Sequence, residues 1–214
     1  MSNFVDRPAE MAELERVLLS KQQSCRQRIS ILHGLGGIGK TQLAVEFARR
    51  HHRRFSSVFW LDGRSEDSLK RSIASCASRI PQGQIPETSR AYSADGSIDF
   101  NAVVKGVMDW LAQLDNTAWL LIFDNVDREY DSCGADPDAY DVKCYLSGAD
   151  HGSVLITTRL ARLEQFGDSQ QLGKVDRRQA EAIFKNWYKR KYGKAPTQYA
   201  GRYEQLKLTI RLQT

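Results

Sequence analysis

Hydrophobic residues occur along the chain in two patterns, and together these patterns predict its elements. Short continuous runs at 29–32, 57–62, 119–123 and 153–158 are rich in β-branched and aromatic residues. Such runs are typical of strands that are buried on both faces of a parallel sheet. The stretch 169–172 predicts a short fifth strand.

Between these runs, apolar residues recur every three or four positions, which predicts amphipathic helices. Asp6, Ser65 and Asp176 stand where the N-caps of three helices are expected. Strands that alternate with helices favour an α/β fold, with helices on both faces of a parallel sheet. The apolar positions are Met11, Leu14 and Leu18; Leu43, Ala44, Phe47 and Ala48; Leu69, Ile73, Cys76 and Ile80; Phe100, Val103, Val104, Val107, Trp110, Leu111 and Leu114; and Ala180, Ile183, Phe184 and Trp187.

Two segments are less regular than the rest. Residues 81–98 contain turn formers throughout and predict an exposed loop. Residues 196–212 predict a further helix, which has no stop signal at its end.

The turn after the first strand run carries the strongest chemical signal. Residues 34–41 fit the pattern GxxxxGK[ST] at every required position. Backbone N–H groups of such a loop, together with the start of the next helix, attract phosphate. Lys40 is expected on the β- and γ-phosphates and the Thr41 hydroxyl on Mg²⁺. The residues assigned to nucleotide binding here are Gly34, Gly36, Gly37, Ile38, Gly39, Lys40, Thr41 and Gln42.

Polar residues at the ends of two predicted strands complete the candidate site. Asp124 ends the most apolar run, where its carboxylate can hold Mg²⁺ with Thr41; the alternative is a polar residue that caps a strand. Asp127 either polarises the attacking water or belongs to an acidic loop at 127–141. Arg159 follows the run 153–158 and can stabilise charge on a γ-phosphate, or it is an ordinary surface residue. The predicted catalytic residues are Lys40, Asp124, Asp127 and Arg159.

Composition is that of an ordinary globular protein, with 214 residues, 41% of them hydrophobic and 27% charged. No apolar run reaches the roughly 20 residues of a membrane span, and the first residues lack the layout of a secretory signal. A cytoplasmic protein is therefore expected. The cysteines are Cys25, Cys76, Cys133 and Cys144, whose wide spacing predicts reduced thiols rather than a metal site.

The net charge of +5 is unevenly distributed. Acidic residues gather between 115 and 150, and basic residues gather between 174 and 211 and in the run 49–54. The basic segments allow binding of nucleic acid or an acidic partner; solvated helix faces, or a helix end that attracts cations, are the simpler explanation.

Five motifs in this order resemble the NB-ARC domain of STAND-class NTPases, particularly fungal NOD-like receptors. The resemblance implies a three-layer P-loop NTPase domain with a five-stranded parallel sheet over residues 1–173. It implies that 174–214 begin a helical subdomain, which is incomplete. Val5 and Arg7 are then expected along the adenine. The motifs are Phe4 to Arg7 (hhGR, with Asp6 in place of glycine), Gly34 to Thr41, Leu120 to Asp124, Thr157 to Arg159 (TTR), and the apolar positions Leu172, Val175, Ala180, Ile183 and Phe184.

The resemblance implies a signalling switch that binds ATP or ADP with Mg²⁺ and hydrolyses slowly or not at all. In relatives, the residue at the position of Arg159 contacts the γ-phosphate, and the presence of this phosphate controls oligomerisation. Sensor and effector domains take part in this control. Asn125 stands where the family has a second acid, so the base assignment moves to Asp127. The family's GLPLA and MHD motifs do not occur before Thr214, which implies weaker retention of ADP.

Two other functions remain open. One is a regulator in which nucleotide gates nucleic-acid binding, although no helix-turn-helix or aromatic-basic ribonucleoprotein signature is visible. The other is a truncated module that binds nucleotide without turnover. The sequence contains no NKxD stretch, which argues against guanine specificity, and no acceptor site of a small-molecule kinase was found.

Overall fold

The computed structural model describes residues 4–20, 26–86, 99–128, 130, 136 and 139–192. Its centre is a sheet of five parallel strands in the order β2-β3-β4-β1-β5. This arrangement confirms the predicted parallel α/β sheet. The strands are β1 (Arg28–His33), β2 (Ser57–Asp62), β3 (Trp119–Asp124), β4 (Ser153–Thr158) and β5 (Asp168–Gln171).

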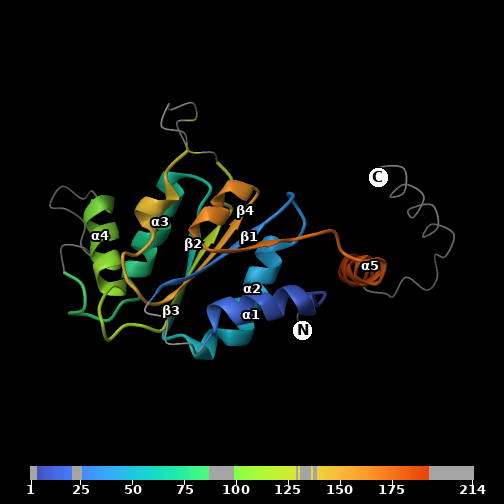
Figure 1. The fold of residues 1–214 in the computed structure, drawn as a ribbon, viewed down its shortest axis with the longest axis horizontal. Coiled ribbons are helices and arrows are strands. Elements are labelled where there is room, and N and C mark those ends of the chain that lie inside the picture. Colours follow the sequence, from blue (N-terminus) through green and yellow to red (C-terminus); the bar gives the residue numbers. More distant parts are fainter. Residues whose placement is uncertain are drawn as a thin grey trace. The chain divides into compact units, whose positions relative to one another are not determined.

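Helices cover both faces of this sheet, so the fold has the three layers that were predicted (Figure 1). The helices α3 and α4 lie on one face, and α1 and α2 lie on the other. The elements are α1 (Pro8–Leu18), α2 (Lys40–His51), α3 (Glu66–Ala77), α4 (Phe100–Leu111) and α5 (Arg177–Tyr192), with short 3-10 turns at η1 (His52–Arg54), η3 (Val142–Tyr145) and η4 (Ala161–Phe166).

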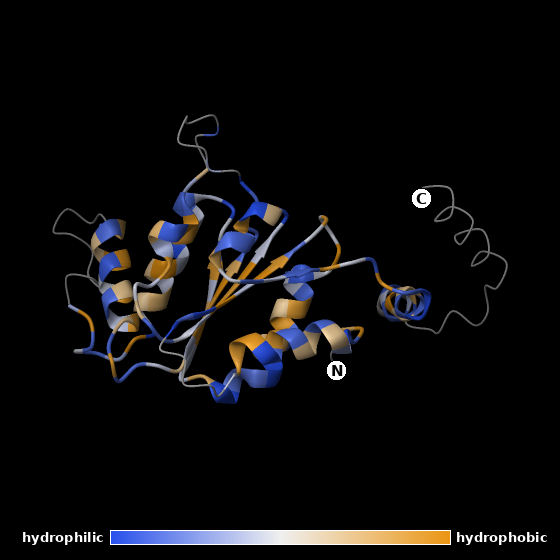
Figure 2. Cartoon of the chain, in the orientation of Figure 1, coloured by the Kyte–Doolittle hydropathy of each residue, from blue (hydrophilic) through white to orange (hydrophobic). Residues whose placement is uncertain are grey.

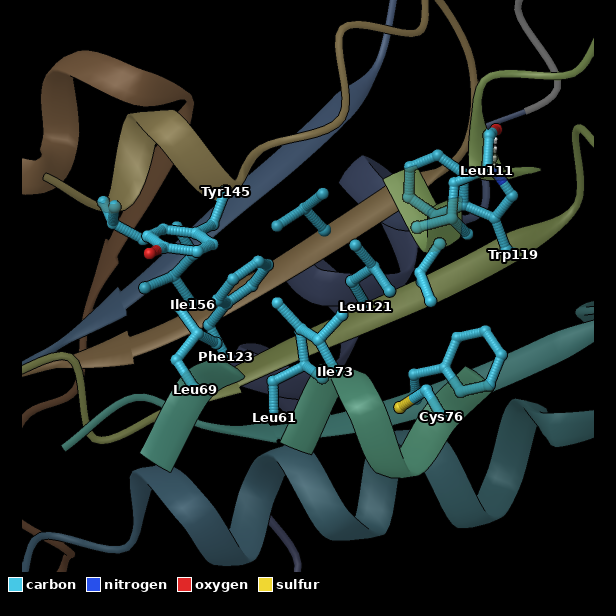
Figure 3. Packing of buried hydrophobic residues seen from close by; sticks show 14 of the residues in the cluster. Leu61, Leu69, Ile73, Cys76, Leu111, Trp119, Leu121, Phe123, Tyr145 and Ile156 are labelled. Atoms are coloured by element: carbon cyan, nitrogen blue, oxygen red, sulfur yellow. Dashed lines mark hydrogen bonds between the residues drawn. The ribbon is translucent and has the colours of Figure 1, made fainter. Parts of the chain in front are cut away.

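The core is built from strand residues that alternate between the two faces. Phe123 and Ile156 point toward α3, where they meet Leu69 and Ile73 (Figure 3). At the other end of the same layer, the Trp119 indole N–H donates to the Leu111 carbonyl at 2.9 Å. The strands β1 to β4 are consequently rich in hydrophobic residues, whereas the helices combine hydrophobic and hydrophilic positions (Figure 2).

The N-caps predicted for α3 and α1 have different outcomes in the structure. Ser65 caps α3 as predicted, accepting a hydrogen bond from the Ser68 N–H at 3.2 Å. The prediction for Asp6 was wrong, because Arg7 occupies the N-cap position of α1. Its side chain makes no capping hydrogen bond. Pro8, the first residue of α1, has no N–H, which removes one of the unpaired backbone donors at the start of the helix.

The helix predicted through Leu114 ends earlier. At the end of α4, the Trp110 carbonyl accepts from the Gln113 N–H at 3.3 Å and from the Asn116 side-chain amide at 3.1 Å. Leu114 therefore lies beyond the helix and is 87% exposed. Ile80 also follows its helix, α3, but stays buried in the core.

Contacts divide the chain into two compact units. The core unit is Arg7–Gly173, and the α5 unit is Met1–Asp6 with Lys174–Thr214. In the α5 unit, Asp176 and Gln179 cap α5 reciprocally, since the Gln179 N–H donates to Asp176 Oδ1 at 2.7 Å and Gln179 Oε1 accepts from the Asp176 N–H at 3.0 Å. The predicted Asp176 cap is confirmed.

Several sequence predictions fall outside the described residues. These are the loop beyond residue 86, the helix at 196–212, the thiols of Cys25 and Cys133, and most of the acidic loop. Cys76 and Cys144 are free thiols, Cys76 being buried and Cys144 exposed. In the described part of the chain, no helix is both long and apolar enough to cross a membrane.

Candidate functional site

The Gly-rich loop joins β1 to α2 at the edge where the carboxyl ends of the strands lie. Gly34, Gly37 and Gly39 have φ of +144°, +73° and +103°, a region that disfavours any side chain. A Cβ on Gly34 would also lie 2.8 Å from the Leu172 carbonyl oxygen. The loop is thus shaped by glycine, and the amino end of α2 adds its positive dipole at the same place.

Lys40, the first residue of α2, turns back over the loop. Its ammonium donates to the carbonyl oxygens of Gly34 at 2.8 Å and Leu35 at 3.0 Å. Burial lowers the pKa of the Lys40 ammonium, while the nearby carboxylates of Asp127 and Asp124 act in the opposite direction. A positive charge held in a partly desolvated loop interacts strongly with an anion.

Asp124 lies at the end of β3 and is bound by three neutral side chains. Its Oδ1 accepts from the hydroxyls of Thr41 at 2.8 Å and Thr157 at 2.6 Å. Its Oδ2 accepts from the Asn125 amide at 3.1 Å. The carboxylate is buried. The position of the Asp124 side chain therefore depends on α2, on β4 and on Asn125.

This set of groups fits a divalent cation such as Mg²⁺. A threonine hydroxyl and a carboxylate are hard oxygen ligands of the kind that Mg²⁺ accepts. No ion pair of Asp124 is found among the described residues, so its buried charge is not neutralised by a direct partner. No cluster of three or more His, Cys, Asp or Glu side chains occurs there either. A cation at Thr41 and Asp124 would take its remaining ligands from phosphate and water.

Arg159, which follows β4, lies beside the loop. A Cβ on Gly36 would be 3.4 Å from the guanidinium carbon of Arg159. Asp127 binds this arginine twice: its Oδ2 is 2.8 Å from the Arg159 side-chain Nε, and its Oδ1 accepts from the Arg159 backbone N–H at 2.7 Å. The geometry brings Arg159 to the loop and gives both carboxylate oxygens of Asp127 a partner.

Arg7 has a structural role that sequence reasoning missed. Its buried guanidinium donates to the carbonyls of Ile38 at 3.0 Å and Gly173 at 3.2 Å, and it pairs with Glu10 at 3.3 Å. These bonds tie the start of α1 to the loop. A lone arginine before a proline gives no signal of such contacts. Val5 belongs to the α5 unit, so its predicted place along the adenine stays a prediction.

Gln42 and Thr157 are two further residues near the loop. Gln42 is exposed in the first turn of α2. Thr157 was expected only as part of a γ-phosphate sensor, but its hydroxyl holds Asp124 and also accepts from the Asn125 N–H at 3.0 Å. Only the register of β3 and β4 reveals this contact.

Comparisons with known proteins find a relative in sequence and solved structures of similar fold. No family model matches the chain. A curated nucleotide-binding leucine-rich repeat (NLR)-like protein of Hyaloscypha variabilis is 28% identical over 172 residues, which cover 74% of this chain and 16% of that protein. The chain thus spans a small part of this relative.

Two solved structures share the architecture. Cdc6p from Pyrobaculum aerophilum superposes with a TM-score of 0.53 at 15% identity, over 87% of this chain and 51% of that chain. The ORC2 protein of Aeropyrum pernix, solved as ADPNP-ADP complexes, gives 0.51 at 16% identity, over 87% and 52%. The fold is that of a P-loop NTPase. Within this P-loop NTPase fold, the Gly34 to Thr41 loop joins β1, which lies between β4 and β5, to α2.

Proposed function

We propose that this chain is the ATP- and ADP-binding core of a STAND-type signalling switch of the NB-ARC kind. The observation that carries the proposal is the meeting of Lys40, Thr41 and Asp124 at one sheet edge, with Arg159 against the loop. Similarity to an NLR-like protein supports the switch class. In the full-length protein, the nucleotide state would control self-association or contacts with sensor and effector domains in the cytoplasm.

Each residue has a chemical task in this proposal. The loop N–H groups and the Lys40 ammonium bind the β- and γ-phosphates. Thr41 and Asp124 hold Mg²⁺, which neutralises phosphate charge when it is bound. Arg7 keeps the loop in place through the Ile38 carbonyl.

Arg159 would read the γ-phosphate by exchanging partners. Its guanidinium, 64% exposed, is paired with Asp127, and a γ-phosphate near Gly36 would compete with that carboxylate. Such a competition makes the Asp127–Arg159 pair a two-state element that ATP and ADP bias differently. Because Asp127 is occupied on both oxygens, its geometry supports this holding role better than the role of a catalytic base.

Slow or absent turnover is part of the proposal. Asn125, next to Asp124, is an amide that donates to that carboxylate and cannot accept a proton from water at neutral pH. A module that binds nucleotide without turnover is the second candidate. Release of inorganic phosphate from ATP distinguishes the two, since binding without release identifies the module.

The two units have proposed tasks as well. We propose that residues 1–173 bind the nucleotide and that 174–214 begin a helical subdomain. On α5, Ile183 and Trp187 are large apolar residues that remain 45% and 44% exposed. Such side chains are expected to be covered in a complete helical subdomain.

The binding assignment is tested by calorimetry with ATP and ADP in the presence of Mg²⁺. Lys40→Ala should lower the affinity at least about 100-fold, because it removes charge-assisted bonds to two phosphates. Lys143→Ala is the matched control, since Lys143 is an exposed lysine on η3 and does not belong to the loop. Undiminished affinity in Lys40→Ala, with circular dichroism showing a native fold, would reject the proposal.

A further inference from the structure

A cavity lies far from the phosphate loop. It has a volume of about 320 Å³ and is lined by Arg26, Arg28, Arg54 and His151, with Leu18 and Phe55 among its apolar residues. Arg28 begins β1, whereas Phe55 and His151 shortly precede β2 and β4. The cavity is therefore at the amino edge of the sheet. Strands of six residues place it roughly 20 Å from the carboxyl edge.

The framework of this cavity is held by backbone bonds at the starts of the strands. The Arg28 N–H donates to the Gly152 carbonyl at 3.1 Å, and the Ser56 N–H donates to the Ala118 carbonyl at 2.6 Å. His151 is fixed as well, since one ring nitrogen is 3.0 Å from the Leu111 carbonyl and the other 3.0 Å from Asp150. The walls are thus positioned by the same sheet that positions the phosphate loop.

The charge in the cavity is positive and incompletely paired. No aspartate or glutamate is among its lining residues in the described part of the chain. Arg28 uses one nitrogen to donate to the Ser20 carbonyl at 2.8 Å. Arg26 and Arg54 make neither a hydrogen bond nor an ion pair with the described residues. Two guanidinium groups, and most of a third, remain available to a ligand.

The structure also divides the basic run at 49–54. Arg49 and Arg50 pair with the buried carboxylate of Glu46, at 2.6 Å and 2.7 Å. Arg53 is exposed and is not among the lining residues, and Arg54 lines the cavity. The run is therefore not a continuous basic stripe of the kind that follows a nucleic-acid backbone. Its unpaired charge is joined instead by Arg26 and Arg28 from a distant part of the chain.

We propose that this cavity binds a small phosphate-bearing anion. Guanidinium groups bind phosphate through paired N–H bonds, and three of them match a multiply charged ligand. The volume is at the small end of ligand pockets, which favours one or two phosphates with a small organic group rather than a macromolecule. Leu18 and Phe55 provide an apolar wall for that group.

Inorganic pyrophosphate is the probe, titrated by calorimetry into the Lys40→Ala chain at low salt so that the phosphate loop contributes little. One binding event should remain. Adding Arg54→Gln should weaken this event at least about tenfold, because a charge-assisted pair is lost. Adding Arg53→Gln, the matched neighbour outside the cavity, should change it less than about twofold. Arg28→Gln should repeat the Arg54 result, and circular dichroism reports the folding of each variant.

Three outcomes would overturn the proposal. The first is the absence of pyrophosphate binding to folded Lys40→Ala. The second is an equal loss for Arg53→Gln and Arg54→Gln, which would indicate diffuse attraction along the run. The third is tighter binding of a short single-stranded oligonucleotide that depends on Arg53 as much as on Arg54. None of these depends on ATP binding at the loop, so the two proposals fail separately.

Discussion

The two edges of the sheet handle charge in opposite ways. At the carboxyl edge, Lys40 and Asp124 are buried, and neutral groups of the loop and of β4 bind them at short distances. At the amino edge, Arg26 and Arg54 are exposed and make no pair with the described residues. The carboxyl edge is therefore organised before a ligand binds, whereas the amino edge presents positive charge that the described residues do not pair.

This difference predicts different selectivity. Groups that are buried and fixed distinguish ligands by geometry, because a misplaced partner leaves them unsatisfied. Exposed guanidinium groups attract anions more generally, and salt screens the attraction. We therefore expect the buried groups of the carboxyl edge to select a polyphosphate with bound Mg²⁺, and the amino edge to accept several phosphate-bearing anions.

The largest expected effect is a loss of folding stability caused by overpacking at the amino edge. In Gly152→Ala, the new Cβ would lie 2.3 Å from the buried Trp119 ring, at a φ of +81°. The cost should be about 3 kcal/mol of unfolding free energy, from overpacking and backbone strain together. Urea denaturation measures it. Gly148→Ala, where a Cβ meets nothing within 4 Å, is the control and should be nearly neutral.

The next largest effect is expected at Asp124, at the carboxyl edge. Asp124→Asn keeps an oxygen that can accept from Thr41 and Thr157 but removes the charge. The Mg²⁺-dependent part of the ATP affinity should fall about 100-fold, with little loss of stability. Calorimetry with and without Mg²⁺ measures it. Asp62→Asn, in register with Asp124 on β2 but paired with Arg64, should change the affinity little; an equal loss would argue against a cation at Asp124.

Glu46 determines how much of the basic run is neutralised, and its effect depends on pH. Hydrogen bonds from Arg49, aided by those from Arg50, lower the pKa of Glu46 to about 2 against the burial that would raise it. A lowered folded-state pKa gives stability that is present above the unfolded value near 4.5 and is lost as pH falls toward 2.

Glu46→Gln should therefore cost about 2 kcal/mol of unfolding free energy at pH 7, a figure reduced for the exposure of Arg49. The difference from wild type should shrink as pH falls below about 4.5. Denaturation at several pH values measures it. A difference that stays constant down to pH 3 would show that the ion pairs do not contribute in this way.

The smallest effect concerns the choice between nucleotides. Asp127→Asn weakens the pair with Arg159, so the ratio of ATP to ADP affinity should rise about threefold, as expected for an exposed ion pair. Arg159→Ala should lower the same ratio. Asp150→Asn, an exposed acid at the amino edge, is the control. A fall in the ratio for Asp127→Asn would contradict this competition, whereas loss of phosphate release with an unchanged ratio would support its role as a base.

Much of the fold could be predicted because its signals are local. Buried runs marked the strands and helical spacing marked the helices. The loop from Gly34 to Thr41 is a continuous segment, so its glycines and its lysine could be recognised without knowing which residues they contact. The errors, at Asp6 and Leu114, lie at helix ends, where contacts such as that of the Asn116 amide with the Trp110 carbonyl leave no clear signal in the sequence.

The layered α/β fold and the phosphate loop could be predicted from the sequence alone. The tertiary structure was needed to show that Thr157 holds Asp124, that Arg7 supports Ile38, and that Arg26, Arg28 and Arg54 line one cavity. The physical reason is that parallel strands are joined by long crossovers, so the order and register of the sheet, rather than any nearby residue, bring these groups to a common edge.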